Sequence, residues 1–139
     1  MIKNKHVFIT GGGSGIGRAI ALLFADEGAT VTITGRRSKA LEEVANERAN
    51  ISAFQMDVSN EKQVVSVISQ AVSQCGPIQV CVANAGIAEG KKLQNTDLDF
   101  WKKIMGTNLD GTFLTIRETM KSMLEAEWGR VIAISSIAG

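Results

Sequence analysis

Short apolar runs rich in β-branched residues alternate along the chain with segments whose apolar residues recur every three or four positions. Runs of the first kind predict strands of a parallel sheet covered on both faces, and segments of the second kind predict amphipathic helices. The predicted strands are His6–Thr10, Thr30–Thr34, Ile51–Met56, Gln79–Ala83 and Val131–Ser135. This alternation predicts an α/β fold built on a doubly wound parallel sheet with right-handed crossovers.

Capping and turn residues limit the helices between these strands, because Ser and Asn favour helix N-termini and Gly favours the residue after a helix. The predicted helices are Ile16–Glu27, Ser38 to about Arg48, Ser59 or Asn60 up to Gly76, a short helix behind a capping box of Thr96 and Asp99, and about Asn108 to Glu127. The last of these carries Leu109, Phe113, Ile116, Met120 and Leu124 on one side.

Length and composition restrict the class of protein. The 139 residues suffice for one domain, 1–139, and 45% hydrophobic with 21% charged residues is typical of a globular protein. A formal net charge of +1 gives no reason to expect a nucleic-acid or membrane partner. The sequence shows no apolar run of the ~20 residues that a membrane span needs, and no signal peptide pattern. Two cysteines and one histidine suggest neither a disulfide framework nor a metal cluster, so we expect a cytoplasmic protein without bound metal and a structural role for His6.

Five glycines fall within the seven positions that follow the first strand, Gly11 to Gly17. Such a turn lets backbone N–H groups and a helix N-terminus approach an anion. The loop does not match a P-loop, because Arg18 and Ala19 stand where a Lys and a Ser or Thr would bind phosphate and magnesium. An S-adenosylmethionine site usually has an acid at the end of the second strand, where this chain has Gly35-Arg36. The spacing that fits is T-G-x-x-x-G-x-G, beginning at Thr10.

This glycine motif and four further motifs, in order along essentially the whole chain, resemble the classical short-chain dehydrogenase/reductase family. The further motifs are Asp57-Val58, Asn84-Ala85-Gly86, Asn108 within TNLDG, and Ser136 before the final glycine. The resemblance implies a Rossmann-type doubly wound parallel sheet, truncated after the fifth strand, that forms an incomplete NAD(P)-binding domain. It also implies reversible hydride transfer between a nicotinamide cofactor and a ketone or secondary alcohol, as in 3-oxoacyl reductases and related enzymes.

The resemblance assigns roles to individual residues. Ser136 would hold the substrate oxygen and Asn108 would support a water-linked proton relay, so these two are the predicted catalytic residues. The predicted cofactor-binding residues are Thr10, Gly11, Ser14, Gly15, Ile16, Gly17, Arg36, Arg37, Asp57, Val58, Asn84, Ala85 and Gly86.

The end of the second strand indicates which cofactor is bound. Members that prefer NAD(H) usually carry an Asp there, which binds the ribose hydroxyls and repels a 2′-phosphate, whereas this chain has Gly35. Arg36 or Arg37 offers a guanidinium suited to phosphate oxygens. We therefore predict NADP(H) in preference to NAD(H).

The family's Tyr-x-x-x-Lys motif has no match here, since the sequence contains no tyrosine. We expect the chain to be the cofactor-binding portion of a longer reductase and to be inactive alone. The alternatives are a natural non-catalytic NADP-binding module and a chain that obtains its missing half from another chain. The resemblance further implies a homodimer or homotetramer for the complete protein, with Met120, Met123 and Leu124 in an interface, and a small carbonyl or alcohol substrate.

Overall fold

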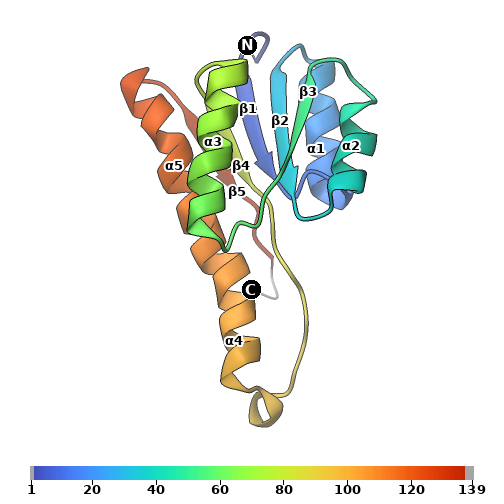
Figure 1. Cartoon of the computed structure of the whole chain (residues 1–139), viewed down its shortest axis with the longest axis vertical. Helices are drawn as coiled ribbons and strands as arrows, with labels where there is room; N and C mark the ends of the chain where they lie inside the picture. The colour runs from blue at the N-terminus through green and yellow to red at the C-terminus, as the bar shows by residue number, and fades with distance from the viewer. Residues whose placement is uncertain (1, 137–139) are drawn as a thin grey trace.

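The computed structural model describes residues 2–136 and contains one parallel sheet (Figure 1). Its strands are β1 (His6–Thr10), β2 (Thr30–Gly35), β3 (Ile51–Gln55), β4 (Val80–Ala83) and β5 (Arg130–Ala133). They pair in the order β3-β2-β1-β4-β5, so the direction of winding reverses between β1 and β4. This order confirms the predicted doubly wound sheet, and the strand limits agree with the prediction to within two residues.

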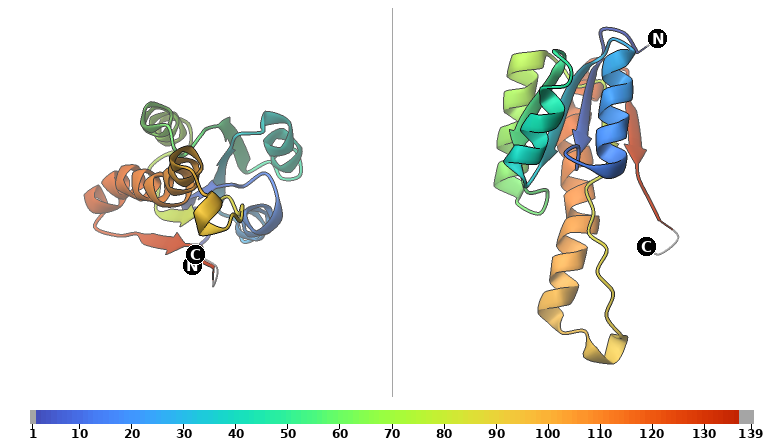
Figure 2. Two further views of the ribbon diagram at one scale, coloured as in Figure 1. Left: turned by 90° about the horizontal axis from the view of Figure 1, so that it is seen from below. Right: turned by 90° about the vertical axis from the view of Figure 1, so that its right-hand side faces the viewer.

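Helices cover both faces of this sheet (Figures 1 and 2). They are α1 (Gly15–Asp26), α2 (Ser38–Ala45), α3 (Glu61–Cys75), α4 (Leu98–Met105) and α5 (Gly111–Glu125), with a 3₁₀ turn η1 (Leu93–Asn95) and a π-helical segment η2 (Gly106–Asp110). Helices α1 and α2 pack on one face and α3 and α5 on the other.

Alternation along the strands divides the buried residues between two cores. Val7 and Ile9 of β1 face α1 and α2, where Ile33 and Leu41 join them. Phe8, between them in sequence, faces α3 and α5. Because both cores continue across several strands, the central strands are buried on both sides, as their apolar runs predict.

The observed helix caps differ from the predicted ones at two of three places. Asn60, one of the two candidates, caps α3 and accepts a hydrogen bond from the Gln63 N–H at 3.1 Å. At α2 the N-cap residue is Arg37, without a side-chain hydrogen bond, and Ser38 is already helical, so the predicted Ser38 cap is wrong. At α4 the predicted capping box is also wrong, because Asp97 accepts the Phe100 N–H at 2.7 Å.

Helices α4 and α5 form one continuous helical stretch through η2, and α4 extends beyond the carboxyl ends of the strands (Figures 1 and 2). The residues that α5 buries include Leu114, Glu118 and Met123, and of the predicted apolar stripe Ile116 alone packs, partly buried, against the same core. Four residues of that stripe are exposed: Leu109, Phe113, Met120 and Leu124. Met123, one of the three residues predicted to lie in an interface, is only 7% exposed and belongs to the chain's own core.

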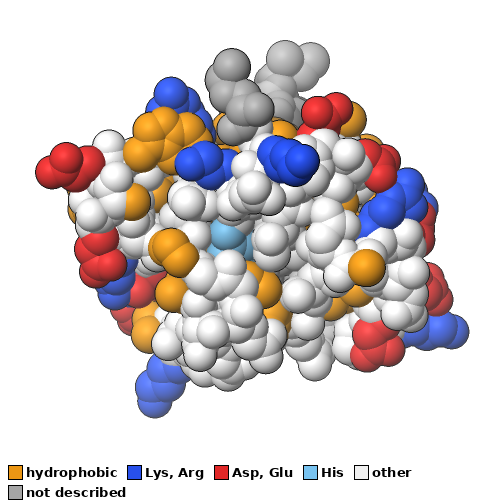
Figure 3. All heavy atoms as spheres, turned by 90° about the horizontal axis from the view of Figure 1, so that it is seen from above, with side chains coloured by type: hydrophobic (Ala, Val, Ile, Leu, Met, Phe, Trp, Pro, Cys, Tyr) orange, Lys and Arg blue, Asp and Glu red, His pale blue; other side chains and the backbone are white. Residues whose placement is uncertain are grey.

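The opposite end of the molecule, where the strands begin, holds the chain's one histidine, visible in pale blue in Figure 3. His6 is 2% exposed, and its Nδ1 lies 2.8 Å from the Gly76 carbonyl oxygen while its Nε2 lies 2.8 Å from the Thr32 hydroxyl. A carbonyl only accepts, so Nδ1 carries the proton and Nε2 accepts from Thr32. These contacts tie β1 to β2 and to the end of α3, which is the structural role predicted for His6.

No helix within residues 2–136 is both long enough and apolar enough to cross a membrane.

Candidate functional site

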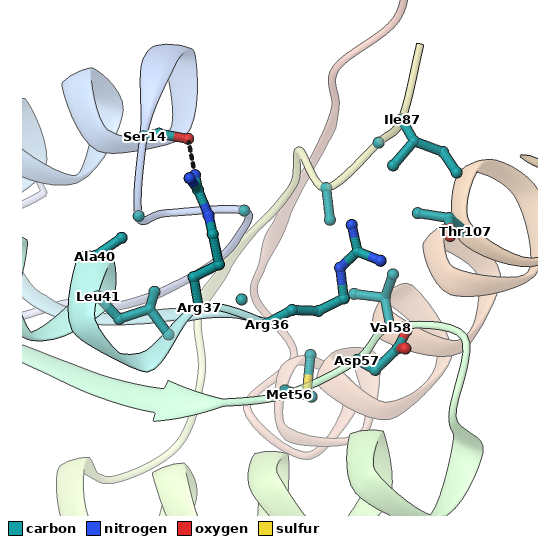
Figure 4. Close-up of a pocket in the computed structure, with 15 residues that line it drawn as sticks. Ser14, Arg36, Arg37, Ala40, Leu41, Met56, Asp57, Val58, Ile87 and Thr107 are labelled. Carbon is teal, nitrogen blue, oxygen red and sulfur yellow. Dashed lines mark hydrogen bonds between the residues drawn. The ribbon is translucent and has the colours of Figure 1, made fainter. Parts of the chain in front are cut away.

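A cleft of about 420 Å³ lies at the carboxyl ends of the strands, and we call it the strand-end cleft (Figure 4). It is lined by Gly11, Gly13, Ser14, Gly35, Arg36, Arg37, Ala40, Leu41, Met56, Asp57, Val58, Ala85, Gly86, Ile87 and Thr107. The lining comes from segments that follow all of the first four strands. In an open parallel sheet, ligands bind in this position because the strand order reverses there and leaves a crevice.

The glycine loop forms one wall of the cleft by close backbone packing. Gly11 has φ +67°, a left-handed conformation that favours glycine, and a Cβ there would lie only 2.9 Å from the Asn84 amide nitrogen and 3.1 Å from the Ala85 Cα. A Cβ on Gly17 would overlap the Gly11 carbonyl oxygen and the Asn84 side chain. Glycine at both positions therefore lets the first turn of α1 pack against the end of β1.

Thr10 and Asn84 support the loop from behind and do not line the cleft. The Thr10 hydroxyl accepts the N–H groups of Asn84 and Ala85, both at 3.0 Å. The Asn84 carboxamide donates to the carbonyl oxygens of Thr10 and Gly11 at 3.0 and 3.3 Å. These bonds fix the ends of β1 and β4 relative to each other. The structure thus gives these two predicted binding residues a positioning role toward the loop.

Three further predicted residues of the loop, Gly15, Ile16 and Gly17, lie outside the lining. Ile16 is 62% exposed on α1, and Gly17 is buried behind the loop. Of the predicted loop residues, only Gly11 and Ser14 face the cleft itself.

The two arginines after β2 point in different directions (Figure 4). Arg37 extends toward the glycine loop and donates to the Ser14 hydroxyl at 3.2 Å. Arg36 extends the other way, toward Val58, and its side chain makes no hydrogen bond or ion pair with the described part of the chain. The end of β2 thus directs one positive charge toward the glycine loop and another toward Val58.

Asp57 and Val58 form the wall opposite the glycine loop. The Asp57 carboxylate accepts hydrogen bonds from the Ser59 N–H and hydroxyl, at 2.9 and 2.7 Å, and the Asp57 N–H donates to Gln63 at 2.8 Å. Val58 packs against Gly111 of α5, where a Cβ would overlap the Val58 side chain. Both residues are held by their neighbours before any ligand binds.

Asn108 lies in the π-helical segment η2, beside the lining residue Thr107. Its carboxamide forms two hydrogen bonds with the Ile87 backbone, accepting the N–H at 2.8 Å and donating to the carbonyl at 2.9 Å. The side chain thereby holds the segment after β4 that lines the cleft. Ser136 lies three residues beyond β5, is exposed, and is not among the lining residues. The catalytic roles of Asn108 and Ser136 stay predictions.

The sequence motifs did not identify six lining residues: Gly13, Ala40, Leu41, Met56, Ile87 and Thr107. Each lies within four residues of a motif or of a residue singled out for chemistry. Small size at Gly13 and Ala40, and burial of Leu41 and Met56, shape the wall without adding a reactive group. Because such residues contribute shape alone, their types give no chemical signal.

Cys81, on β4, does not line the strand-end cleft. It is fully buried, and this burial raises the pKa of its thiol to about 11, against a smaller opposing effect of the Thr119 hydroxyl. A thiol with such a pKa stays protonated at neutral pH, which is the property of a structural cysteine and not of a nucleophile.

Comparison with known proteins agrees with this arrangement. The sequence profile of the short chain dehydrogenase family matches residues 5–139. An uncharacterized oxidoreductase of Staphylococcus aureus is 33% identical over 141 residues, which cover 100% of this chain and 61% of that protein. A 3-oxoacyl-[acyl-carrier-protein] reductase of Aquifex aeolicus is 33% identical over 99% of this chain and 58% of that protein. The crystal structure of a short-chain type dehydrogenase/reductase from Mycobacterium marinum superposes with a TM-score of 0.94 at 32% identity, over 99% of this chain and 58% of that one.

The chain therefore spans about 60% of the length of the curated relatives it matches. The profile match covers nearly all of its residues, and the strand order and glycine loop agree with the match. By these criteria the chain belongs to the short chain dehydrogenase family.

Proposed function

We propose that this chain is the cofactor-binding portion of an oxidoreductase that uses NADP(H) to interconvert a ketone and a secondary alcohol. The observation that carries the proposal is the strand-end cleft, which combines a close-packed glycine loop with two arginines and no carboxylate at the end of β2. The relatives named as oxidoreductases support the reaction class.

The residues present fit a dinucleotide. Backbone at Gly11 and Gly13 leaves room for a diphosphate beside the first turn of α1, whose N–H groups attract anions. Asp57 and Val58 would meet the adenine, and Ala85 and Gly86 would lie along the riboses. When bound, the cofactor supplies the hydride, while these residues orient it.

The preference for NADP(H) rests on charge at the end of β2. Arg37 is already directed toward Ser14, so its guanidinium is the nearer candidate to bind a 2′-phosphate, and the Ser14 hydroxyl adds a second group. Gly35 contributes no carboxylate that would repel this phosphate. A Cβ at Gly35 would meet Leu41 at 3.5 Å, an ordinary contact distance, so an acidic side chain is sterically allowed there.

Equilibrium titration of the whole protein with NADPH and NADH tests the preference. We expect NADPH to bind about tenfold or more tightly than NADH. Arg37→Ala should weaken NADPH binding and leave NADH binding nearly unchanged, and Gly35→Asp should reverse the preference. Tighter binding of NADH to the unaltered protein would contradict the proposal.

A non-catalytic NADP-binding module is the second candidate, because the sequence contains no tyrosine to act as the proton donor that the family uses. A turnover assay distinguishes the reductase from the non-catalytic module. Oxidation of NADPH by the whole protein with any member of a broad ketone panel supports the reductase, whereas tight NADPH binding without turnover supports the module.

We also propose that the complete protein is a homodimer or homotetramer that buries the outer face of α5. Phe113, Met120 and Leu124 are exposed along this face, and Leu109 of the adjoining η2 continues the stripe at helical spacing. An aligned set of large apolar side chains is more typical of an interface than of a solvated surface.

A further inference from the structure

A second hollow, of about 440 Å³, adjoins the strand-end cleft, and we call it the outer hollow. It is lined by Arg36, Gln55, Met56, Asp57 and Gln63. Three of these residues, Arg36, Met56 and Asp57, also line the strand-end cleft. A ligand bound in the cleft against Asp57 therefore has space beyond that residue.

Several side-chain acceptors of the outer hollow already take part in hydrogen bonds, whereas most of its side-chain N–H donors do not. The Asp57 Oδ1 accepts two hydrogen bonds from Ser59, and the Gln63 Oε1 accepts the Asp57 N–H. The Gln55 Nε2 donates to the Arg36 carbonyl at 2.9 Å.

The side-chain donor groups that form no hydrogen bond within residues 2–136 are the guanidinium of Arg36 and the amide nitrogen of Gln63, and the Gln55 Nε2 keeps one further N–H. The acceptors that remain are the Gln55 Oε1 and the Asp57 Oδ2. A guanidinium offers up to five N–H groups and an amide nitrogen two, so unused donors outnumber unused acceptors.

The proposed function places adenine against Asp57, and the inference rests on that placement. An aspartate only accepts hydrogen bonds, so the part of adenine that can donate to Asp57 is its 6-amino group. This group has two hydrogens. One can donate to the Asp57 Oδ2 while the other is replaced by a substituent that extends past Asp57 into the outer hollow.

We propose that the outer hollow is a subsite for an anionic substituent on the 6-amino group of the cofactor's adenine. A carboxylate at the end of a two-carbon chain would accept from the Arg36 guanidinium and the Gln63 amide. Repulsion by Asp57 is reduced, because the bonds from Ser59 and from the adenine N–H satisfy that carboxylate. A neutral substituent of equal length would fill the hollow without using the donors.

The test compares N6-(2-carboxyethyl)-NADP⁺ with N6-propyl-NADP⁺ and with NADP⁺ by calorimetric titration of the whole protein. We expect the carboxyethyl compound to bind about three- to tenfold more tightly than the propyl compound, since charge-assisted hydrogen bonds at a partly exposed site are worth this much. The advantage should fall as ionic strength rises.

Gln63→Glu is the informative variant. A glutamate keeps an oxygen to accept the Asp57 N–H and replaces the amide donor by a second anionic oxygen. The ratio of affinities for the two analogues should drop to one or below, and the use of a ratio removes any general change in cofactor binding. Gln70→Glu is the control, because Gln70 is exposed on the same helix and contacts Ser66, so the ratio should stay as in the unaltered protein.

Two outcomes overturn the inference alone while the proposed function stands: NADP⁺ binds but the two analogues bind equally, or the advantage persists in Gln63→Glu. Absence of NADP⁺ binding overturns both together.

Discussion

Gly17 is the residue at which one added carbon has the clearest effect. Gly17→Ala would place a methyl group against the Gly11 carbonyl oxygen and the Asn84 carboxamide, which are backbone or hydrogen-bonded atoms that have little room to move. We expect a loss of about 1–3 kcal/mol in the free energy of unfolding, as for other overpacked sites, and a loss of NADPH binding of more than tenfold. Denaturant unfolding and NADPH titration measure the two effects.

Gly90→Ala is the matched control for this substitution. Gly90 lies in the segment between β4 and η1, and a Cβ there meets no atom within 4 Å. The control should leave both stability and binding within error of the unaltered protein. Equal effects of the two substitutions would show that the close packing at Gly17 does not matter.

His6 makes stability depend on pH. Burial lowers the pKa of its imidazole, and the hydrogen bond to Gly76 opposes this effect only in part. In the unfolded state His6 has its ordinary pKa of about 6.5. Below this pH the unfolded state binds more protons than the native state, so the free energy of unfolding rises with pH. The contribution of His6 is complete above about pH 6.5 and is lost as the pH falls toward the native pKa.

A variant without an ionisable group isolates this contribution. We expect the unaltered protein to lose up to about 1.4 kcal/mol per pH unit more than His6→Asn as the pH falls below about 6.5. Urea unfolding at several pH values from 5 to 8 gives both slopes. Parallel slopes would mean that His6 keeps its ordinary pKa in the folded protein.

At the scale of single elements, the cap of α3 is the simplest to test. The Asn60 side chain accepts the Gln63 N–H, which would otherwise lack a partner in the first turn. Asn60→Ala should therefore lower the free energy of unfolding by about 0.5–2 kcal/mol. Ser69→Ala, at an exposed position in the middle of the same helix, should be neutral or slightly stabilising. Thermal unfolding of the two variants distinguishes loss of the cap from a general effect of substitution in α3.

The elements themselves were predictable because their patterns are strong. Apolar runs rich in β-branched residues predicted all five strands, although β5 is exposed in the structure, and the order of helices between them predicted the winding of the sheet. The caps were less predictable, since Thr96, Asp97 and Asp99 are all capable of capping and only the backbone conformation selects Asp97. The same ambiguity affected Ser38, which lies one residue inside α2.

Helix α5 shows why an apolar stripe does not identify the buried face. Its inner face includes Thr115 and Thr119, whose hydroxyls donate to the carbonyls of Gly111 and Thr115 at 2.7 and 2.8 Å. Glu118, also buried, is paired with Arg117 and Lys121. These polar groups are satisfied within the helix, so they can be buried, and the more apolar side is left outside. From sequence alone the two faces rank in the wrong order.

The sequence predicted the residues that line the cleft better than those behind it or in the outer hollow. Motifs identified Gly11, Ser14 and Ala85, which do line the cleft, and close packing against Asn84 and Ala85 restricts the residue type at Gly11. Thr10 and Asn84 belong to the same motifs, but they hydrogen-bond to the backbone behind the cleft and do not line it. The spacing of a motif does not distinguish these two positions. The outer hollow was not predictable, since Gln55 and Gln63 are ordinary exposed residues until the fold brings them to Asp57.

At the scale of the whole molecule, the strand-end cleft and the outer face of α5 are supported by the same helix. Asn108, in η2, fixes Ile87 at the cleft, and the exposed stripe of large apolar residues begins at the next residue, Leu109. An assembly that buries this stripe would therefore also restrain the segment that lines the cleft. Cofactor binding and association are expected to strengthen each other, because a restraint at either place reduces the motion of the same segment.

Phe113→Glu tests the association most directly. Phe113 is 58% exposed at the centre of the stripe, so a carboxylate there would be costly to bury in an interface. Within one chain the substitution should be tolerated, because Arg117, now 5.5 Å from the Phe113 ring, lies one turn further along and can pair with a glutamate. We expect sedimentation of the whole protein to change from oligomer to monomer, with a weakening of association on the order of 2 kcal/mol or more, typical of a central interface residue. Val65→Glu, at an exposed apolar position on α3, should leave the oligomer intact. An oligomer that is equally stable in both variants would place the interface elsewhere.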